Sequence, residues 1–232
     1  MIPFEREFRP QYSVPLSDQV VEFLTDAIIE GRLEDGQRLV ENDLQRRFGV
    51  SRGPIREAFR VLDKNGLVQI VPRKGTFIKK ISQKDIEEIF PILAYLESLA
   101  ARIAIAHITN VDIENMELAL TGMVEASTKK DFRSYLRNHF DFHKIFIKAS
   151  KNDALIEIIE RVRRQAVWFR FSYLYVEESF EYSLPVHRKI LELFCKKDLD
   201  RVEALVKEHF FIALERIIRL LESRSQGSKG GI

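Results

Sequence analysis

The hydrophobic pattern of the chain changes its period at Gly66, and this change limits how the N-terminal third can fold. Before Gly66, apolar residues recur at helical spacing in three stretches, at residues 16–31, 41–48 and 51–65. After Gly66, residues 67–71 and 76–80 are rich in β-branched and aromatic side chains and flank a turn at 72–75. Three helices followed by a small hairpin are typical of a winged helix-turn-helix.

The second and third helical stretches are joined by a tight turn. Leu44 and Phe48 lie four residues apart in the second stretch, and Gly49 is suited to end it. Ser51 is a favourable N-cap for the third stretch. Because only Gly49 and Val50 separate the two short helices, their spacing is that of a helix-turn-helix.

The net charge of +2 for the 232-residue chain is an average over unlike segments. Residues 49–80 hold eight basic and two acidic side chains, which gives +6. Residues 1–48 hold six basic and ten acidic side chains, which gives −4, and residues 81–232 are neutral with 23 of each. Positive charge confined to one short segment is expected of a nucleic-acid-binding surface, and a solvated helix face is the alternative explanation of the charge alone.

The third helical stretch has the polarity of a helix that enters the major groove. Arg52 and Arg56 lie four residues apart on one face, opposite the apolar Ile55 and Phe59. Guanidinium groups can bond bidentately to O6 and N7 of guanine, and Ser51 at the helix N-terminus is suited to hold a DNA phosphate. Helix, spacing, cap and basic hairpin occur together, so we predict DNA binding.

Residues 16–78 resemble the N-terminal domain of GntR-family transcription regulators, most specifically in GVSRGPIREAFRVLDKNGLV. The resemblance implies DNA contacts at Asn42, Ser51, Arg52, Gly53, Arg56 and Gly75. Asn42 departs from relatives that carry arginine there. Arg73 and Lys74, at the hairpin tip, are expected to reach the DNA backbone or the minor groove. Regulators of this family are homodimers that bind pseudo-palindromic operators in double-stranded DNA.

From Ser82 onward the apolar spacing is helical, with no strand-like alternation. We expect one helix from Ser82 to about Ile103 and further helices at about 110–126, 131–149, 153–177, 180–196 and 198–222. The expected fold class is therefore mainly α: an N-terminal winged helix-turn-helix plus a C-terminal all-helical bundle. The expected domains are residues 1–82, residues 83–222 and a flexible tail at 223–232.

Composition indicates a reducing compartment and no membrane. Cys195 is the only cysteine, which excludes an internal disulfide and thiolate-cluster metal sites. Glu5, Arg6, Glu7 and Arg9 are charged where a signal peptide needs an apolar run, and no stretch of 18 apolar residues occurs. We expect a cytoplasmic protein.

Four of the five histidines have suggestive positions. His139 and His143 lie four residues apart and share a helix face, so both imidazoles can reach one metal ion. His187 and His209 come from two later helical stretches. Asp141 lies between the pair in sequence but on another side of the helix, which makes it a poor candidate ligand. By chemistry alone, histidines that face solvent or fill the core are an equal alternative.

Residues 85–222 resemble the all-helical FCD ligand-binding domain of the FadR branch of GntR regulators, as in FHKIFIKASKNDALIEII and HRKILELFCKKDLDRVEALVKEH. Many FCD domains bind a divalent metal with one aspartate and three histidines. The resemblance places His143, His187 and His209 at the histidine positions and His139 at the aspartate position. Four neutral imidazoles favour zinc, nickel or copper over manganese or magnesium, and favour an anionic effector or water as an additional ligand.

The expected effector-binding residues also depart from the family. FCD domains that bind carboxylates often carry an arginine four residues before the glutamate that is Glu97 here, and this chain has Leu93 at that position. Arg163, Arg164 or Arg170 is the candidate replacement, with a solvated surface charge as the alternative for each.

These observations favour a DNA-binding transcriptional regulator, expected to be a repressor, with operator affinity controlled by a metal-associated small-molecule effector. One alternative is a regulator whose helical domain only dimerises, with idle histidines. A metalloenzyme that uses the histidines for hydrolysis is a third hypothesis. It lacks an HExxH-type base and leaves the basic segment unexplained, so we expect no enzyme activity.

Overall fold

The chain divides into two compact units, residues 1–82 and residues 83–232. The structure is a computed structural model, and it describes residues 14–29, 32–80, 82–174 and 178–227. Within these ranges the backbone alone is described at residues 29, 133, 164–174, 178–179 and 224–227.

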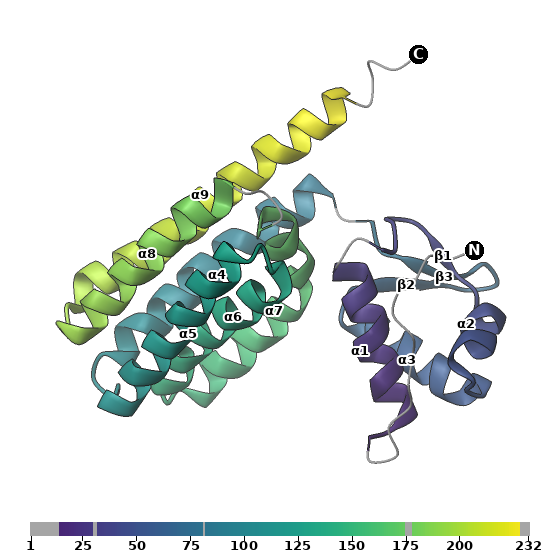
Figure 1. The fold of residues 1–232 in the computed structure, drawn as a ribbon, viewed down its shortest axis with the longest axis horizontal. Helices are drawn as coiled ribbons and strands as arrows, with labels where there is room; N and C mark the ends of the chain where they lie inside the picture. Colours follow the sequence, from purple (N-terminus) through teal and green to yellow (C-terminus); the bar gives the residue numbers. More distant parts are fainter. Residues whose placement is uncertain (1–13, 30–31, 81, 175–177, 228–232) are drawn as a thin grey trace. The chain divides into compact units, whose positions relative to one another are not determined.

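In its described residues, the first unit contains three helices and a small sheet (Figure 1). Its elements are α1 (Leu16–Ile29), β1 (Arg38–Leu39), α2 (Glu41–Phe48), α3 (Arg52–Lys64), β2 (Val68–Val71) and β3 (Gly75–Ile78). The three helices and the hairpin lie where the sequence predicts them. The sheet is antiparallel in the order β1-β3-β2. The unit is therefore a winged helix-turn-helix, as expected.

Strand β1 is the element of the first unit that the sequence does not predict. Arg38 pairs with Phe77 and Leu39 pairs with Thr76, so β1 covers the edge of β3 that β2 leaves open. A strand of two residues is too short to show alternating hydrophobicity, which is why its sequence gives no signal.

The core of the first unit fixes the angle between the helices. Leu24, Leu44 and Leu62, one from each helix, are completely buried. The ring of Phe23 meets the edge of Phe48, with ring centroids 5.1 Å apart. Because α2 ends at Gly49 in the left-handed conformation (φ 66°), the chain reverses at once into α3.

The second unit consists, in its described residues, of helices alone. These are α4 (Gln83–Ala104), α5 (Asn110–Thr128), α6 (Phe132–Ala149), α7 (Asp153–Leu174), α8 (Glu178–Cys195) and α9 (Leu199–Gly227). Helix α4 packs against α6, α7 and α9, while α8 packs against α5 and α9 (Figure 1). This all-helical unit agrees with the expected fold class. Among the described helices, none is both long and apolar enough to cross a membrane.

The ends of these helices follow local chemistry. Thr109 and Asp112 form a reciprocal capping box at the start of α5. The carboxylate of Asp131 accepts a hydrogen bond from the backbone N–H of Ser134 at the start of α6. Helix α9 continues to Gly227, beyond the expected end at 222, because residues 223–226 contain neither proline nor glycine to stop it. The rest of the expected tail, residues 228–232, lies outside the described residues.

Candidate DNA-binding surface and metal centre

The arginines of α3 are exposed and already hold polar partners on α2. Arg52 donates from Nη2 to Oδ1 of Asn42 and from Nε to Oε1 of Gln45, both at 3.3 Å. Arg56 donates from Nε to both carboxylate oxygens of Glu41, at 3.1 and 3.0 Å. These contacts hold both guanidinium groups along one face of the helix-turn-helix, where the sequence places them.

The N-terminus of α3 is open to solvent. Ser51 occupies the N-cap position, and its side chain makes no capping hydrogen bond. Gly53 is exposed, and a Cβ added to it would meet no atom within 4 Å. Nothing in the described fold therefore requires glycine at this position. A small residue and an available hydroxyl at a helix N-terminus suit the close approach of a DNA phosphate.

A groove of about 330 Å³ joins the helix-turn-helix to the sheet. Asn42 and Arg52 line it from the helices, and Arg38 and Gly75 line it from β1 and β3. Gly75 has a φ of +115°, and a Cβ there would lie 3.1 Å from Nε of Arg38. The family resemblance implies DNA contacts at Asn42, Arg52 and Gly75. The sequence does not indicate that Arg38 lines the same groove, because its two-residue strand shows no pattern.

Arg73 and Lys74 are exposed in the turn between β2 and β3, at the tip of the wing. Arg73 has a φ of 63°, in the left-handed region that few residues other than glycine adopt. Both cations lie outside the groove that contains Arg52. The expected DNA-contacting residues therefore fall on two separate parts of the unit, the helix-turn-helix with its groove and the wing tip.

The four singled-out histidines converge inside the second unit. His139 and His143 come from α6, His187 from α8 and His209 from α9. All four are buried, with exposed fractions of 6% or less. One ring nitrogen from each lies within 4.8 Å of the corresponding atoms of the other three. The histidines therefore do not face solvent, and they are a single group of candidate metal ligands.

Hydrogen bonds fix the orientation of two of these rings. Nδ1 of His143 lies 2.8 Å from Oε2 of Glu97, and Nδ1 of His187 lies 2.7 Å from the backbone carbonyl oxygen of Ser183. Because both partners accept hydrogen bonds, both Nδ1 atoms carry the proton. The Nε2 atoms of the neutral rings then present lone pairs, and they lie only 3.0 Å apart.

Two facing lone pairs at this separation repel unless a cation lies between them. Two nitrogens bound at about 2.1 Å to one ion, at tetrahedral or octahedral angles, are about 3.0–3.4 Å apart. The spacing of His143 and His187 therefore fits two ligands of one transition-metal ion, and the imidazole donor set fits zinc or nickel. Asp141 is exposed and does not belong to this group.

The surroundings of the histidines are aromatic and largely apolar. Tyr182 stacks on His209 with ring centroids 6.1 Å apart. The guanidinium of Arg216 lies 4.7 Å from the centroid of the Tyr182 ring. Burial, and secondly the charge of Glu208, raises the pKa of Tyr182 to about 12, so its hydroxyl stays neutral at physiological pH. An ion at the histidines would lie in a low-dielectric environment.

Glu97 is the contact of this site that the sequence analysis leaves without a role. It is completely buried on α4, and its carboxylate also accepts two hydrogen bonds from Arg163, at 2.7 and 2.8 Å. Arg163, expected to bind an anionic effector, thus holds an internal carboxylate. The side chains of Arg164 and Arg170 lie outside the described residues.

Comparisons with known proteins agree with both units. The model of the bacterial regulatory proteins of the gntR family matches residues 16–78, and the FCD domain model matches residues 88–211. The HTH-type transcriptional regulator YdhC of Bacillus subtilis is 30% identical over 93% of this chain and 97% of its own length. The HTH-type transcriptional repressor RspR of Escherichia coli is 26% identical over 91% and 92%.

Solved structures show the same fold. A GntR transcriptional regulator from Rhodococcus sp. RHA1 superimposes with a TM-score of 0.74 at 22% identity, covering 87% of this chain and 97% of that one. Escherichia coli McbR/YncC gives the same TM-score and identity over 91% and 99%. With a gntR-type DNA-binding unit followed by an FCD unit, this chain belongs to the GntR family of DNA-binding transcriptional regulators.

Proposed function

We propose that this chain is a transcriptional repressor whose affinity for its operator is set by a transition-metal ion in the helical unit, together with a small anionic effector. The observation that carries the proposal is the convergence of His139, His143, His187 and His209, all buried and with ligand atoms within 4.8 Å of one another. Repression is favoured because relatives such as RspR are named repressors.

The ligand chemistry favours zinc or nickel. Neutral imidazoles are typical ligands of these ions, whereas manganese and magnesium prefer carboxylate and water oxygens. The four histidines bring no negative charge to offset the +2 of the ion. The charge of Glu97 is shared with Arg163. An anion that joins the centre, or binds near it, is therefore favoured electrostatically.

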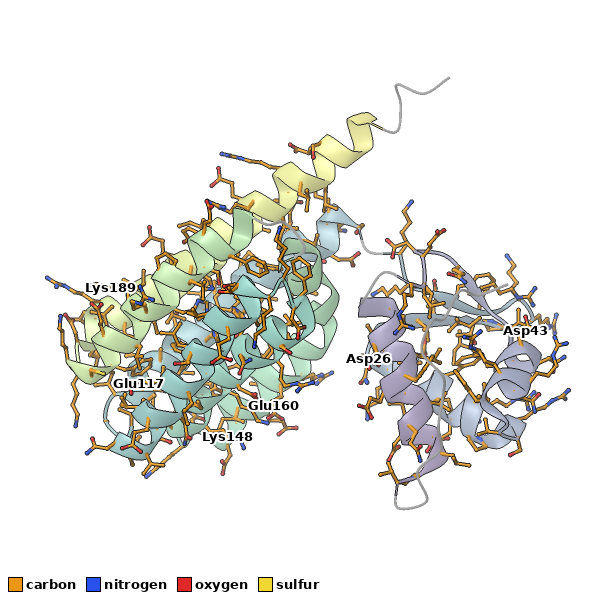
Figure 2. All side chains as sticks on the ribbon, in the orientation of Figure 1. Asp26, Asp43, Glu117, Lys148, Glu160 and Lys189 are labelled. Atoms are coloured by element: carbon orange, nitrogen blue, oxygen red, sulfur yellow. The ribbon has the colours of Figure 1, made fainter. Side chains whose placement is uncertain are left out.

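The effector site that we assign is a groove of about 270 Å³ between α6 and α7. Lys144, Lys148 and Arg163 surround an apolar floor that includes Ile147 and Ile159. Lys148 and Glu160, labelled in Figure 2, come from the two helices that form the groove. Because Glu97 already pairs with Arg163, Lys144 and Lys148 are the cations left to face Glu160, and two cations against one acid suit an anionic ligand with an apolar part.

We assign dimerisation to an exposed apolar face of the helical unit. Ile92, Tyr95 and Leu99 are exposed on one face of α4, and Tyr95 is exposed to 60%. Phe211 of α9 is also exposed and meets the Tyr95 ring edge-on, with centroids 6.2 Å apart. Apolar side chains gathered in this way mark an interaction surface. A homodimer in the cytoplasm would present two recognition helices to a pseudo-palindromic operator.

The test combines metal analysis with DNA binding. Protein purified without a histidine tag is stripped with a chelator and reloaded with Zn²⁺, Ni²⁺ or Mn²⁺, and the bound metal is counted. Its affinity is then measured for a duplex that the same protein has selected from random-sequence DNA. We expect one Zn²⁺ or Ni²⁺ per chain, weak Mn²⁺ binding, and a metal-dependent change in DNA affinity. The same DNA affinity with and without bound metal would instead indicate a helical unit that only dimerises.

A further inference from the structure

We propose that Glu97 and Arg163 are positioning residues of the metal centre, with Glu97 holding His143 as a donor and Arg163 holding Glu97. The proposal rests on the proposed metal centre and adds to it a set of contacts from α4 and α7, two helices that supply none of the four histidines.

The burial of Glu97 is the first argument. It lies on the inner face of α4 with an exposed fraction of 0%. An ionised carboxylate in such a place is strongly unfavourable unless charged partners compensate it. A residue that served only packing in this position would be apolar, as its neighbours Leu93, Ala94 and Ala101 are. The carboxylate is therefore explained by what it binds.

The partners of Glu97 supply the second argument. Oε2 receives both Nδ1–H of His143 and Nη2–H of Arg163, each at 2.8 Å, while Oε1 receives Nε–H of Arg163 at 2.7 Å. The bidentate arginine orients the carboxylate, and the carboxylate sets the tautomer of His143. The Nε2 lone pair of His143 is thereby directed toward Nε2 of His187, 3.0 Å away.

The two fixed histidines are not fixed equally. Nδ1 of His187 donates to the neutral backbone carbonyl of Ser183, on its own helix. His143 instead donates to an ionised side chain on another helix, and charge-assisted hydrogen bonds are the stronger kind. A negative partner raises the basicity of the imidazole more than a carbonyl does. His143 should therefore be a stronger donor than His187, and its strength should depend on Glu97.

The ion pair between Arg102 and Glu203 provides a matched control. Arg102 is on α4, like Glu97, and donates from Nη1 to Oε2 of Glu203 on α9 at 2.6 Å. It joins two helices as the pair of Glu97 and Arg163 does, but in the described part of the chain it makes no hydrogen bond to any of the four histidines. Glu203→Gln therefore removes a carboxylate from an ion pair of α4 without touching the metal ligands.

The experiment measures the Zn²⁺ dissociation constant by chelator competition in the full-length parent, Glu97→Gln, Glu97→Gln/Arg163→Met and Glu203→Gln. The double variant avoids leaving a buried guanidinium beside a neutral amide, and so protects the fold. We expect the Zn²⁺ affinity to fall about 10- to 100-fold in both Glu97 variants. It should stay within about twofold of the parent in Glu203→Gln, where the hydrogen bonds of Glu97 to His143 and Arg163 are intact.

Two further readouts separate positioning from general stability. The visible spectrum of the Co²⁺-loaded protein should change in both Glu97 variants and match the parent in Glu203→Gln. The melting temperature of the metal-free double variant should stay near that of the parent. Unchanged Zn²⁺ affinity and an unchanged Co²⁺ spectrum in a folded double variant would overturn the positioning role alone. A parent that binds neither ion would overturn the metal centre itself.

Discussion

The two units place their candidate functional side chains in opposite environments. In the DNA-binding unit, Arg52 and Arg56 are exposed and hold partners that solvent or DNA can replace. In the helical unit, four histidines and Glu97 are buried, and the contacts of His143 come from the interior. Exposed side chains contribute little to the stability of a fold, whereas buried side chains are part of its core. Substitutions of the exposed arginines should therefore change DNA binding without changing stability. Substitutions of the buried histidines should change metal binding and stability together.

The largest effect is expected for His187→Ala. Removing one of four ligands should abolish most of the metal-dependent stabilisation, which amounts to about 4 kcal/mol when free Zn²⁺ is 1,000 times its dissociation constant. The measurement is thermal or chemical unfolding with and without Zn²⁺, alongside metal content. His107→Ala is the control, because His107 is exposed and lies outside the cluster. Equal metal content in the His187 variant and the parent would show that His187 is not a metal ligand and would contradict the proposed centre.

A smaller effect, confined to binding, is expected for Arg52→Ala. The loss of its contact should weaken operator binding by about 1–3 kcal/mol, while the free energy of unfolding changes by less than about 0.5 kcal/mol because the side chain is exposed. Fluorescence anisotropy with the selected duplex and urea unfolding measure the two quantities. Arg46→Ala, which removes an exposed cation paired with Asp43 on α2, is the control. If the operator affinity of Arg52→Ala equals that of the parent, Arg52 does not contribute to the DNA interface.

The smallest effect is expected for Gly53→Ala, and it sharpens the contrast because binding and stability should move in opposite directions. A Cβ at Gly53 meets no atom of the fold within 4 Å, so alanine should keep or slightly raise stability through its helix propensity. The same methyl group would stand between the start of α3 and the DNA backbone. Operator binding should weaken by about tenfold, or ~1.4 kcal/mol. Unchanged binding would mean that DNA does not approach this position closely.

The contrast also explains what the sequence could predict. The helix-turn-helix could be inferred because its apolar residues recur over three stretches and its cations cluster in one segment. Strand β1 and the position of Arg38 in the groove could not be inferred, because a two-residue strand is too short to show a hydrophobic period. In the helical unit, the spacing of His139 and His143 predicts a shared helix face. Their meeting with His187 and His209 depends on how three helices pack, which no local pattern encodes.

Glu97 shows where a usable signal existed. The buried face of α4 runs through Phe90, Leu93, Ala94 and Ala101, and a glutamate interrupts this stripe. A charged residue at a position that the helical period assigns to the core indicates a buried partner of opposite charge. The identity of that partner could not be predicted, because Arg163 lies 66 residues further along the chain.

Glu41 binds the guanidinium of Arg56 through its carboxylate, at the place where we expect DNA to bind. Both carboxylate oxygens lie within 3.1 Å of Nε of Arg56. In the protein without DNA, the charge of this arginine is therefore already paired with a carboxylate. A random duplex gains little by displacing Glu41, because it exchanges one anion for another of similar strength. A correctly placed guanine can accept two hydrogen bonds from the arginine, and these would offset the loss of the contact with Glu41. If Arg56 contacts a guanine, as we expect, Glu41 would compete more effectively with a wrong site than with the operator. It would then widen the ratio of specific to non-specific binding.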